Sequence, residues 1–198
     1  MVVLGITGPT GAGKTTLLGE VEKLGGAVID CDAVYHEMLE KDIALQCALE
    51  SAFGPLRDKA GQIDRKKLGR IVFRDQAQLK RLNTIAQTAV VERTRELIEA
   101  YREQGRSVVA VDAIALLEST LKNLCQLTVA VLAPAEVRVG RIVIRESIPE
   151  DYAWARVKAQ KESQYFTKNC DITLINDCAS AEEFAAAARK KLGELIQL

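Results

Sequence analysis

A phosphate-binding pattern lies close to the amino terminus. Residues 8–15 read Gly-Pro-Thr-Gly-Ala-Gly-Lys-Thr and match G-x-x-x-x-G-K-[ST]. Glycines let backbone N–H groups converge on phosphate oxygens, and the following helix adds the partial positive charge of its N-terminus. We expect Lys14 to reach the β- and γ-phosphates of ATP and the Thr15 hydroxyl to hold Mg²⁺. The residues predicted to bind ATP here are Gly8, Gly11, Ala12, Gly13, Lys14, Thr15 and Thr16.

Two carboxylates follow the next apolar run, at Asp30 and Asp32. At positions i and i+2 of an extended segment they are expected to point the same way. One could accept the proton of an attacking hydroxyl while the other orients water around Mg²⁺. The alternative is capping of a helix that begins near Ala33. We favour a catalytic role for Asp32 and leave both interpretations open for Asp30.

Three arginines form a second candidate group. Arg138, Arg141 and Arg145 stand at i, i+3 and i+7, which is one stripe of a helix. Guanidinium groups suit a transferring phosphoryl group because they neutralise developing charge without giving up a proton. A solvated basic face is the alternative. We favour a catalytic role for Arg141 and Arg145.

Two further residues have an open role. Asp112 closes the apolar run 108–111, a position that suits an acid organising Mg²⁺ and equally suits a solvated strand end. His36 is the only histidine and lies one helical turn beyond Asp32. It could therefore contact a phosphoryl acceptor, although a lone helix histidine is often simply exposed.

The elements that must position these residues form an α/β pattern. Helical segments, including 14–24, separate short β-branched runs, as in a parallel sheet with crossover helices. We predict a three-layer core of about five parallel strands from residues 1–32, 96–133 and 169–198. Residues 33–95 are predicted to be a helical acceptor-binding insertion, and 134–168 a helical lid. The predicted strands are Val2–Thr7, Ala27–Ile29, Val108–Val111, Leu127–Leu132 and Ile172–Ile175.

The composition limits the possible partners and the location. Lysine plus arginine equals aspartate plus glutamate, at 27 each in 198 residues, so no bulk charge favours nucleic acid or an anionic membrane. The 5 cysteines include no C-x-x-C pair, which indicates reduced thiols. No signal-peptide pattern or long apolar stretch occurs, and we expect a cytoplasmic location.

The motif set favours a kinase among proteins that bind nucleotide triphosphates. A guanine-nucleotide switch needs N-K-x-D, whereas residues 167–171 read Thr-Lys-Asn-Cys-Asp, which is the wrong order. Insertions at strand ends suit an enzyme that encloses a second substrate and excludes water. The alternatives are a kinase of another nucleoside or nucleotide and a diverged, non-catalytic ATP-binding protein.

The order of motifs resembles that of the dephospho-coenzyme A kinases. The opening matches through residues 6–15, the D-x-D of Asp30 and Asp32, and His36. The G-x-[IL]-D-R-x-x-L-G segment at residues 61–69 is the most discriminating piece, because ordinary nucleotide kinases lack it. The match extends through Phe53-Gly54, Val72-Phe73, Asp112 to Glu118, Arg141, Arg145, Gln160 and Ile175-Asn176.

The resemblance implies an activity and a set of residue roles. ATP would phosphorylate the ribose 3′-hydroxyl of dephospho-coenzyme A, in a protein that is a monomer or a small homo-oligomer. The family's proposed base matches Asp32, and its phosphate-binding arginines match Arg141 and Arg145. Asn176 matches the residue near the adenine, and Arg65 matches the arginine of the acceptor domain. With His36 and Asp112, these are the residues predicted to contact the substrates.

The chain departs from the family pattern at a few positions. Gln87-Thr88 stands where the family usually has His-Pro, Ile114 where it has proline, Ser163 where arginine is common, and Cys31 where alanine is usual. The first departure lies in the predicted acceptor-binding half. These changes therefore bear on the acceptor rather than on ATP.

Overall fold

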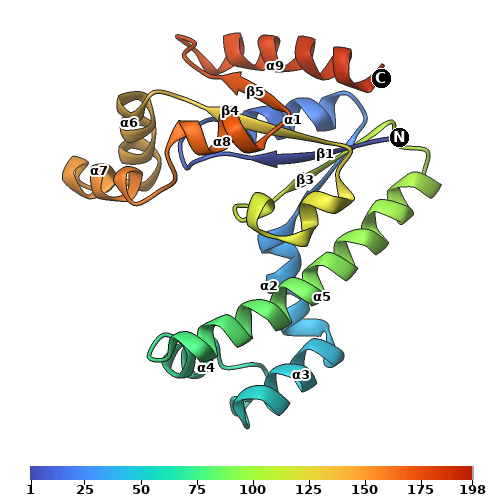
Figure 1. The fold of residues 1–198 in the computed structure, drawn as a ribbon, viewed down its shortest axis with the longest axis vertical. Helices are drawn as coiled ribbons and strands as arrows, with labels where there is room; N and C mark the ends of the chain where they lie inside the picture. The colour runs from blue at the N-terminus through green and yellow to red at the C-terminus, as the bar shows by residue number, and fades with distance from the viewer. Residues whose placement is uncertain (198) are drawn as a thin grey trace. The chain divides into compact units, whose positions relative to one another are not determined.

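A computed structural model of the chain describes residues 1–197, which form two compact units (Figure 1). The first, here called the sheet unit, comprises residues 1–29 together with those from Leu97 onward. The second, here called the helical unit, comprises Asp30–Glu96. The helix α5 (Gln76–Glu103) contributes residues to both units.

A five-stranded parallel sheet organises the sheet unit, in the order β2-β3-β1-β4-β5. β1 pairs with β3 and β4, and β4 pairs with β5, each in parallel. The predicted α/β class and the strand positions are confirmed, with two strands one residue longer than predicted. The strands are β1 (Val2–Thr7), β2 (Ala27–Asp30), β3 (Val108–Asp112), β4 (Leu127–Leu132) and β5 (Ile172–Ile175).

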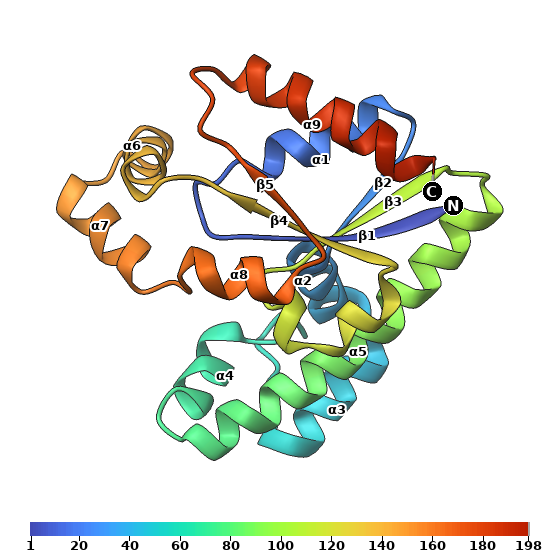
Figure 2. The ribbon, with the colours of Figure 1, turned by 45° about the horizontal axis from the view of Figure 1, so that its top comes forward.

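Helices cover both faces of this sheet (Figure 2). On one face, α1 (Lys14–Lys23) and α9 (Ala181–Ile196) bury side chains such as Leu17 and Phe184 against Leu4 and Ile6 of β1. On the other, α8 (Ser163–Asn169) buries Phe166 against β4, beside the short turns η1 (Leu116–Glu118) and η2 (Thr120–Leu124). β1 is therefore almost fully buried, which explains its continuous apolar sequence.

Two helices between β4 and α8 form a small satellite core. α6 (Ala135–Glu146) and α7 (Glu150–Lys158) pack through Val139 and Ile142 against Ala153 and Val157. The turn between them contains Ser147 in a left-handed conformation, with φ of 53°. The predicted helical character of residues 134–168 is thus confirmed, whereas a lid function stays a prediction.

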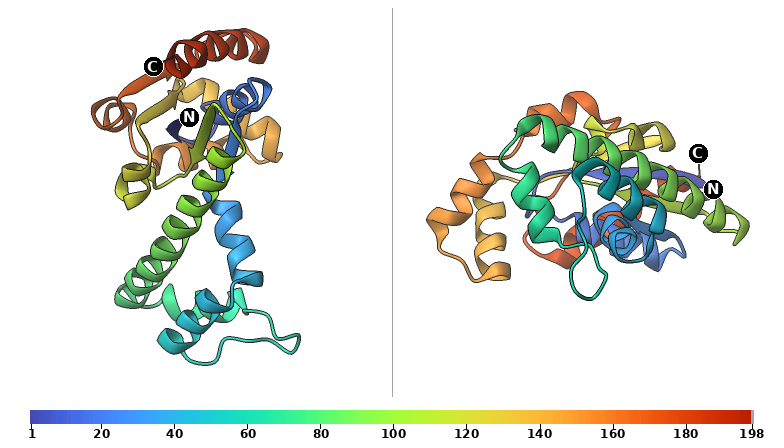
Figure 3. Two further views of the ribbon diagram at one scale, coloured as in Figure 1. Left: turned by 90° about the vertical axis from the view of Figure 1, so that its right-hand side faces the viewer. Right: turned by 90° about the horizontal axis from the view of Figure 1, so that it is seen from below.

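The helical unit consists of α2 (Cys31–Lys41), α3 (Ile43–Phe53), α4 (Arg65–Val72) and the first part of α5, which runs alongside α3 (Figure 3). Local capping interactions set where its helices begin and end. The Asp42 carboxylate accepts the N–H of Leu45 and begins α3, and Gly54, at φ of 81°, ends it.

The start of α2 corrects one prediction from the sequence. The helix begins at Cys31 rather than near Ala33, because the Asp30 carboxylate caps it by accepting the N–H groups of Asp32 and Ala33, at 2.9 and 3.0 Å. Asp32 therefore lies in the first helical turn and not in an extended segment. The expectation that Asp30 and Asp32 project the same way from a strand was wrong.

No helix within residues 1–197 combines the length and the apolar character that a bilayer crossing requires. The 28-residue α5, which is the longest of the helices described above, carries charged side chains along its length, including Arg93, Glu96 and Arg102.

A buried carboxylate links the two helices on one face of the sheet. Glu20 of α1 is 1% exposed and pairs with Arg189 of α9 at 2.6 Å and with Lys23 at 2.7 Å. The hydrogen bond from Arg189, followed by that from Lys23, lowers the pKa of Glu20. The pair consequently stabilises the fold only while Glu20 is ionised.

We expect Glu20→Gln to lower the urea midpoint of unfolding at pH 7. Because the folded pKa lies below the unfolded value of about 4.3, the stabilisation is complete above that pH and is lost as the pH falls through the folded pKa. The difference in urea midpoint between wild type and variant should therefore disappear at acidic pH. Glu194→Gln on α9, which removes an exposed pair with Lys191, is the matched control. Equal losses in the two variants would contradict a special role of the buried pair.

Candidate active site

The phosphate-binding loop connects β1 to α1 through glycines that no other residue could replace. Gly8 has φ of 139°, and a Cβ there would lie 2.2 Å from the carbonyl oxygen of Val131 in β4. Gly13, the N-cap of α1, has φ of 108°, and a Cβ there would lie 2.3 Å from Nδ2 of Asn176. The loop is therefore wedged between the helix and the ends of β4 and β5.

Lys14 and Thr15 follow in the first turn of α1. The Lys14 Nζ donates to the carbonyl oxygen of Gly8 at 2.8 Å, so the ammonium group lies across the loop. The Thr15 side chain is exposed at the N-terminus of α1. This is the arrangement expected of a phosphate cradle with a hydroxyl available to Mg²⁺.

The loop forms the floor of a pocket of about 420 Å³ within the sheet unit. Its charged lining residues are Lys14, Arg141, Arg145 and Asp112. Three cations against one carboxylate make the pocket locally cationic in a chain whose formal net charge is zero. A multiply charged phosphate ester is the ligand that such a pocket suits. The rest of the lining is Pro9, Thr10, Gly11, Ala12, Gly13 and Thr15.

Arg141 braces the loop from α6. Its Nη1 donates to the carbonyl oxygens of Gly11 and Ala12, at 3.2 and 3.4 Å, and its Nη2 donates to Asn176 at 3.1 Å. Asn176 is buried, and its Nδ2 donates to the Ala12 carbonyl at 2.9 Å. Asn176 does not line the pocket described above, so its visible contacts support the loop, and contact with the adenine stays a prediction.

Arg145 also reaches the pocket but is held differently. Its side chain is exposed and pairs with Glu146 at 2.7 Å, and Glu146 pairs in turn with Arg156. The hydrogen bonds from Arg145 and Arg156 lower the pKa of Glu146, which keeps this carboxylate ionised. Of the predicted arginine stripe, Arg141 and Arg145 thus line the pocket, whereas Arg138 is buried beneath the loop.

Asp112 stands at the carboxyl end of β3, in register with Ile6 of β1. The parallel pairing brings it beside the phosphate loop, where it is partly exposed and lines the pocket. Glu118, six residues later, accepts a hydrogen bond from the Tyr165 hydroxyl at 2.8 Å on the surface. Of these two acids, only Asp112 is placed to influence a bound triphosphate.

The other predicted substrate-binding residues belong to the helical unit. Asp32 and His36 are both exposed and lie one turn apart on α2. Arg65 begins α4 and pairs with Glu40 at 3.2 Å, beside a pocket of about 530 Å³. The predicted site residues thus fall into two sets, one around the glycine loop in the sheet unit and one in the helical unit, and the substrate of each set stays a prediction.

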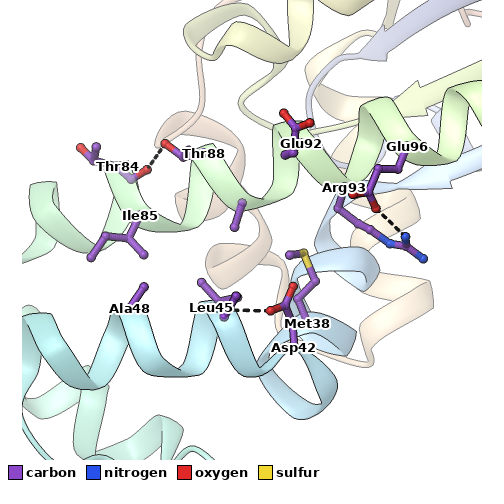
Figure 4. Close-up of a pocket in the computed structure, with 12 residues that line it drawn as sticks. Met38, Asp42, Leu45, Ala48, Thr84, Ile85, Thr88, Glu92, Arg93 and Glu96 are labelled. Atoms are coloured by element: carbon purple, nitrogen blue, oxygen red, sulfur yellow. Dashed lines mark hydrogen bonds and ion pairs between the residues drawn. The ribbon is translucent and has the colours of Figure 1, made fainter.

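The helical unit also contains an apolar groove of about 470 Å³ between α3 and α5 (Figure 4). Leu45 and Ala48 face Ile85 and Thr84 across it. The hydroxyls of Thr84 and Thr88 donate to the carbonyls of the preceding helical turn, at 3.0 and 2.9 Å, so their polar atoms are already bonded. The lining also includes Asp42, Glu92, Glu96 and Arg93, so that acids outnumber bases. The groove therefore suits an apolar chemical group rather than a phosphate.

Sequence reasoning missed how Thr10 and Gln160 come together. They are 150 residues apart, yet the Gln160 Nε2 donates to the Thr10 hydroxyl at 2.8 Å. The sequence contained only a weak signal, namely that Gln160 belongs to the matched family pattern and Arg138 to the arginine stripe. The contact depends on the pairing of α6 with α7, which no local pattern encodes.

Comparisons with known proteins identify the family. A family model described as dephospho-CoA kinase matches residues 2–182. The chain belongs to the dephospho-CoA kinase family. A curated dephospho-CoA kinase of Thermobifida fusca is 32% identical over 98% of this chain and 96% of its own.

Solved structures share the fold of this chain. The protein TT1252 from Thermus thermophilus is 28% identical, with a TM-score of 0.75 over 98% of this chain and 97% of its own. A dephospho-CoA kinase from Campylobacter jejuni, at 24% identity and a TM-score of 0.64 over 97% and 96%, shows the same fold. Membership of this kinase family makes ATP the expected phosphoryl donor.

The fit of the phosphate loop can be tested at one atom. In Gly8→Ala, the new Cβ would meet the Val131 carbonyl at 2.2 Å and would impose a strained backbone. We expect ATP binding, measured by calorimetric titration, to weaken at least a hundredfold, or the protein to lose its cooperative fold. Gly19→Ala is the control, because that helical site is open and should gain up to about 1 kcal/mol of stability. Normal ATP binding by Gly8→Ala would contradict the loop geometry.

Proposed function

We propose that this protein transfers the γ-phosphoryl group of ATP to the ribose 3′-hydroxyl of dephospho-coenzyme A, giving coenzyme A and ADP in the last step of coenzyme A biosynthesis. The carrying observation is the match of the dephospho-CoA kinase model to residues 2–182. The cationic pocket over the glycine loop supplies the matching chemistry, since it suits a nucleoside triphosphate.

The residues of the sheet unit have distinct roles in this proposal. Backbone N–H groups of the loop and of the first turn of α1, among them those of Gly11, Gly13 and Thr15, hold the β- and γ-phosphates. Lys14 exchanges the Gly8 carbonyl for phosphate oxygens. Arg141 and Arg145 neutralise the charge that spreads over the transferring group. Their guanidinium groups stay protonated throughout, so they act by charge and position rather than by proton transfer.

Mg²⁺ fits the donors available in the pocket. The Thr15 hydroxyl and the Asp112 carboxylate are oxygen donors beside the phosphate loop, and Mg²⁺ typically takes one or two protein ligands together with phosphates and water. Among residues 1–197 there is no cluster of three or more His, Cys, Asp or Glu side chains that would hold a metal by itself. We therefore propose that the ion enters with ATP, where it would neutralise phosphate charge.

We assign acceptor binding to the helical unit and a lid role to residues 134–168. Asp32 would accept the proton of the attacking hydroxyl, and His36 and Arg65 would contact the acceptor. Thr88, which stands at one of the departures from the family pattern, lines the apolar groove. We expect a monomer or a small homo-oligomer, which a measurement of the mass in solution would test.

A cytoplasmic location also belongs to the proposal. None of the five cysteines, which all lie within residues 1–197, forms a disulfide, as expected in a reducing compartment.

The direct test is product analysis with an acceptor panel. With Mg-ATP, we expect dephospho-coenzyme A to gain the mass of one phosphate, and adenosine, AMP, CMP and pantothenate to remain unchanged. Lys14→Ala, which removes the ammonium group at the phosphates, is the inactive control. Phosphorylation of another acceptor would retain the kinase and change its substrate. ATP binding without transfer to any acceptor would instead indicate a non-catalytic protein.

Asp32→Asn separates catalysis from ATP binding. Loss of a positioned base should lower kcat by roughly 10²–10⁴-fold and leave the Kd for ATP nearly unchanged, because Asp32 is exposed and lies outside the phosphate pocket. Glu37→Gln, an exposed α2 carboxylate that pairs with Lys41, is the matched control and should keep full turnover. Turnover of Asp32→Asn within twofold of wild type would remove the assignment of Asp32 as the base.

A further inference from the structure

Thr10, in the phosphate loop, is held through all of its polar groups. Its N–H donates to Oε1 of Gln160 at 3.2 Å, and its hydroxyl accepts from Nε2 of the same side chain at 2.8 Å. Its carbonyl oxygen accepts from Nε of Arg138 at 2.9 Å. The Nη2 of Arg138 donates to Oε1 of Gln160, which closes a ring of hydrogen bonds among the three residues. We call this ring the Thr10 clamp.

The two residues that grip Thr10 are themselves fixed by the satellite core. Arg138 lies in the first turns of α6, next to the buried Val139. Gln160 lies two residues beyond the end of α7, and its N–H donates to the carbonyl of Val157 at 3.3 Å. Val139 and Val157 belong to one apolar cluster. The packing of this cluster therefore fixes the positions of Arg138 and Gln160 relative to each other, independently of their contacts with Thr10.

The backbone contact beside the clamp is equally close. Gly11 has φ of 81°, and a Cβ there would lie 2.9 Å from the carbonyl oxygen of Arg138. The loop therefore rests directly on α6 at the residue that bonds Thr10. A shift of Arg138 would be transmitted to the peptide groups of Thr10 and Gly11, both of which line the phosphate pocket.

The burial of Arg138 destabilises the fold, which a purely structural contact would not explain. Arg138 is 5% exposed, and within residues 1–197 it forms no ion pair, only hydrogen bonds to uncharged oxygens. Burying a charge without an opposite charge destabilises a fold. Desolvation lowers the pKa of Arg138, but an arginine side chain stays protonated in proteins. A bound triphosphate is the kind of anion that such a cation beneath the loop would favour.

We propose that Arg138 and Gln160 are positioning residues for ATP: by clamping Thr10 from α6 and α7, they hold the phosphate loop in its binding conformation. They act through the loop and do not line the pocket themselves. The inference depends on the proposed function only in that ATP is the donor. A preorganised loop binds phosphate without first losing conformational entropy. Loss of the clamp should therefore weaken the binding of ATP and leave the binding of the acceptor unchanged.

The test replaces the clamp glutamine by an apolar residue of similar size. In Gln160→Met, we expect the Kd for a non-hydrolysable ATP analogue, measured by titration without acceptor, to rise about tenfold, and the KM for dephospho-coenzyme A to stay within twofold. Gln164→Met changes an exposed glutamine in the same segment and should alter neither value. Because the titration needs no acceptor, it reports on the clamp even if dephospho-coenzyme A is not the substrate.

A double-mutant cycle with Thr10 shows whether Gln160 acts through it. Thr10→Val should raise the Kd several-fold in wild type but less than twofold in Gln160→Met, whereas Thr10→Ser, which keeps the hydroxyl, should resemble wild type. An unchanged Kd in folded Gln160→Met, or full additivity in the cycle, would overturn the proposal. If Gln160→Met does not fold, the comparison of Thr10→Val with Thr10→Ser tests the proposal. Equal Kd values for these two variants would overturn it.

Discussion

The close approach of the phosphate loop to the strand ends is the constraint on which the site depends. A loop that presents its N–H groups to one ligand must turn tightly, and here it turns against the Val131 carbonyl on one side and the Asn176 amide on the other. Only residues without a Cβ fit at Gly8 and Gly13. The sheet order places β4 next to β1 and β5 next to β4, so that these neighbours are available to enclose the loop.

The carbonyl oxygens of the loop create a second requirement. Turning N–H groups toward a ligand turns carbonyl groups away from it, and these need donors of their own. Arg138 supplies one to Thr10, Arg141 supplies donors to Gly11 and Ala12, and Asn176 supplies another to Ala12. The arginine stripe of α6 therefore has two uses. Its inner members hold the back of the loop, and Arg145 remains at the exposed rim of the pocket.

Charge in this protein is organised locally rather than globally. The chain has equal numbers of acidic and basic residues, yet one pocket gathers Lys14, Arg141 and Arg145 around a single carboxylate. In the helical unit the α3–α5 groove is instead apolar. The pocket of the sheet unit thus favours an anionic ligand, and the groove of the helical unit favours an apolar one.

The local sequence determined the strands, the phosphate loop and the break points of the helices. Buried β-branched runs, a G-x-x-x-x-G-K-[ST] turn and glycines such as Gly54 specify structure through backbone sterics and short-range hydrogen bonds. The same local chemistry misled us at Asp30 and Asp32. Either residue could have capped a helix. Because Asp30 is the cap, α2 begins two residues earlier than predicted, and Asp32 lies in its first turn.

Only the tertiary structure decided which polar side chains meet. The strand register brought Asp112 beside the loop, and the packing of α6 on α7 brought Gln160 to Thr10 across 150 residues. It also divided the arginine stripe into the buried Arg138, the bracing Arg141 and the exposed Arg145, although the sequence spacing treats them alike. The physical reason is that helical periodicity fixes which residues share a face, whereas burial depends on what packs against that face.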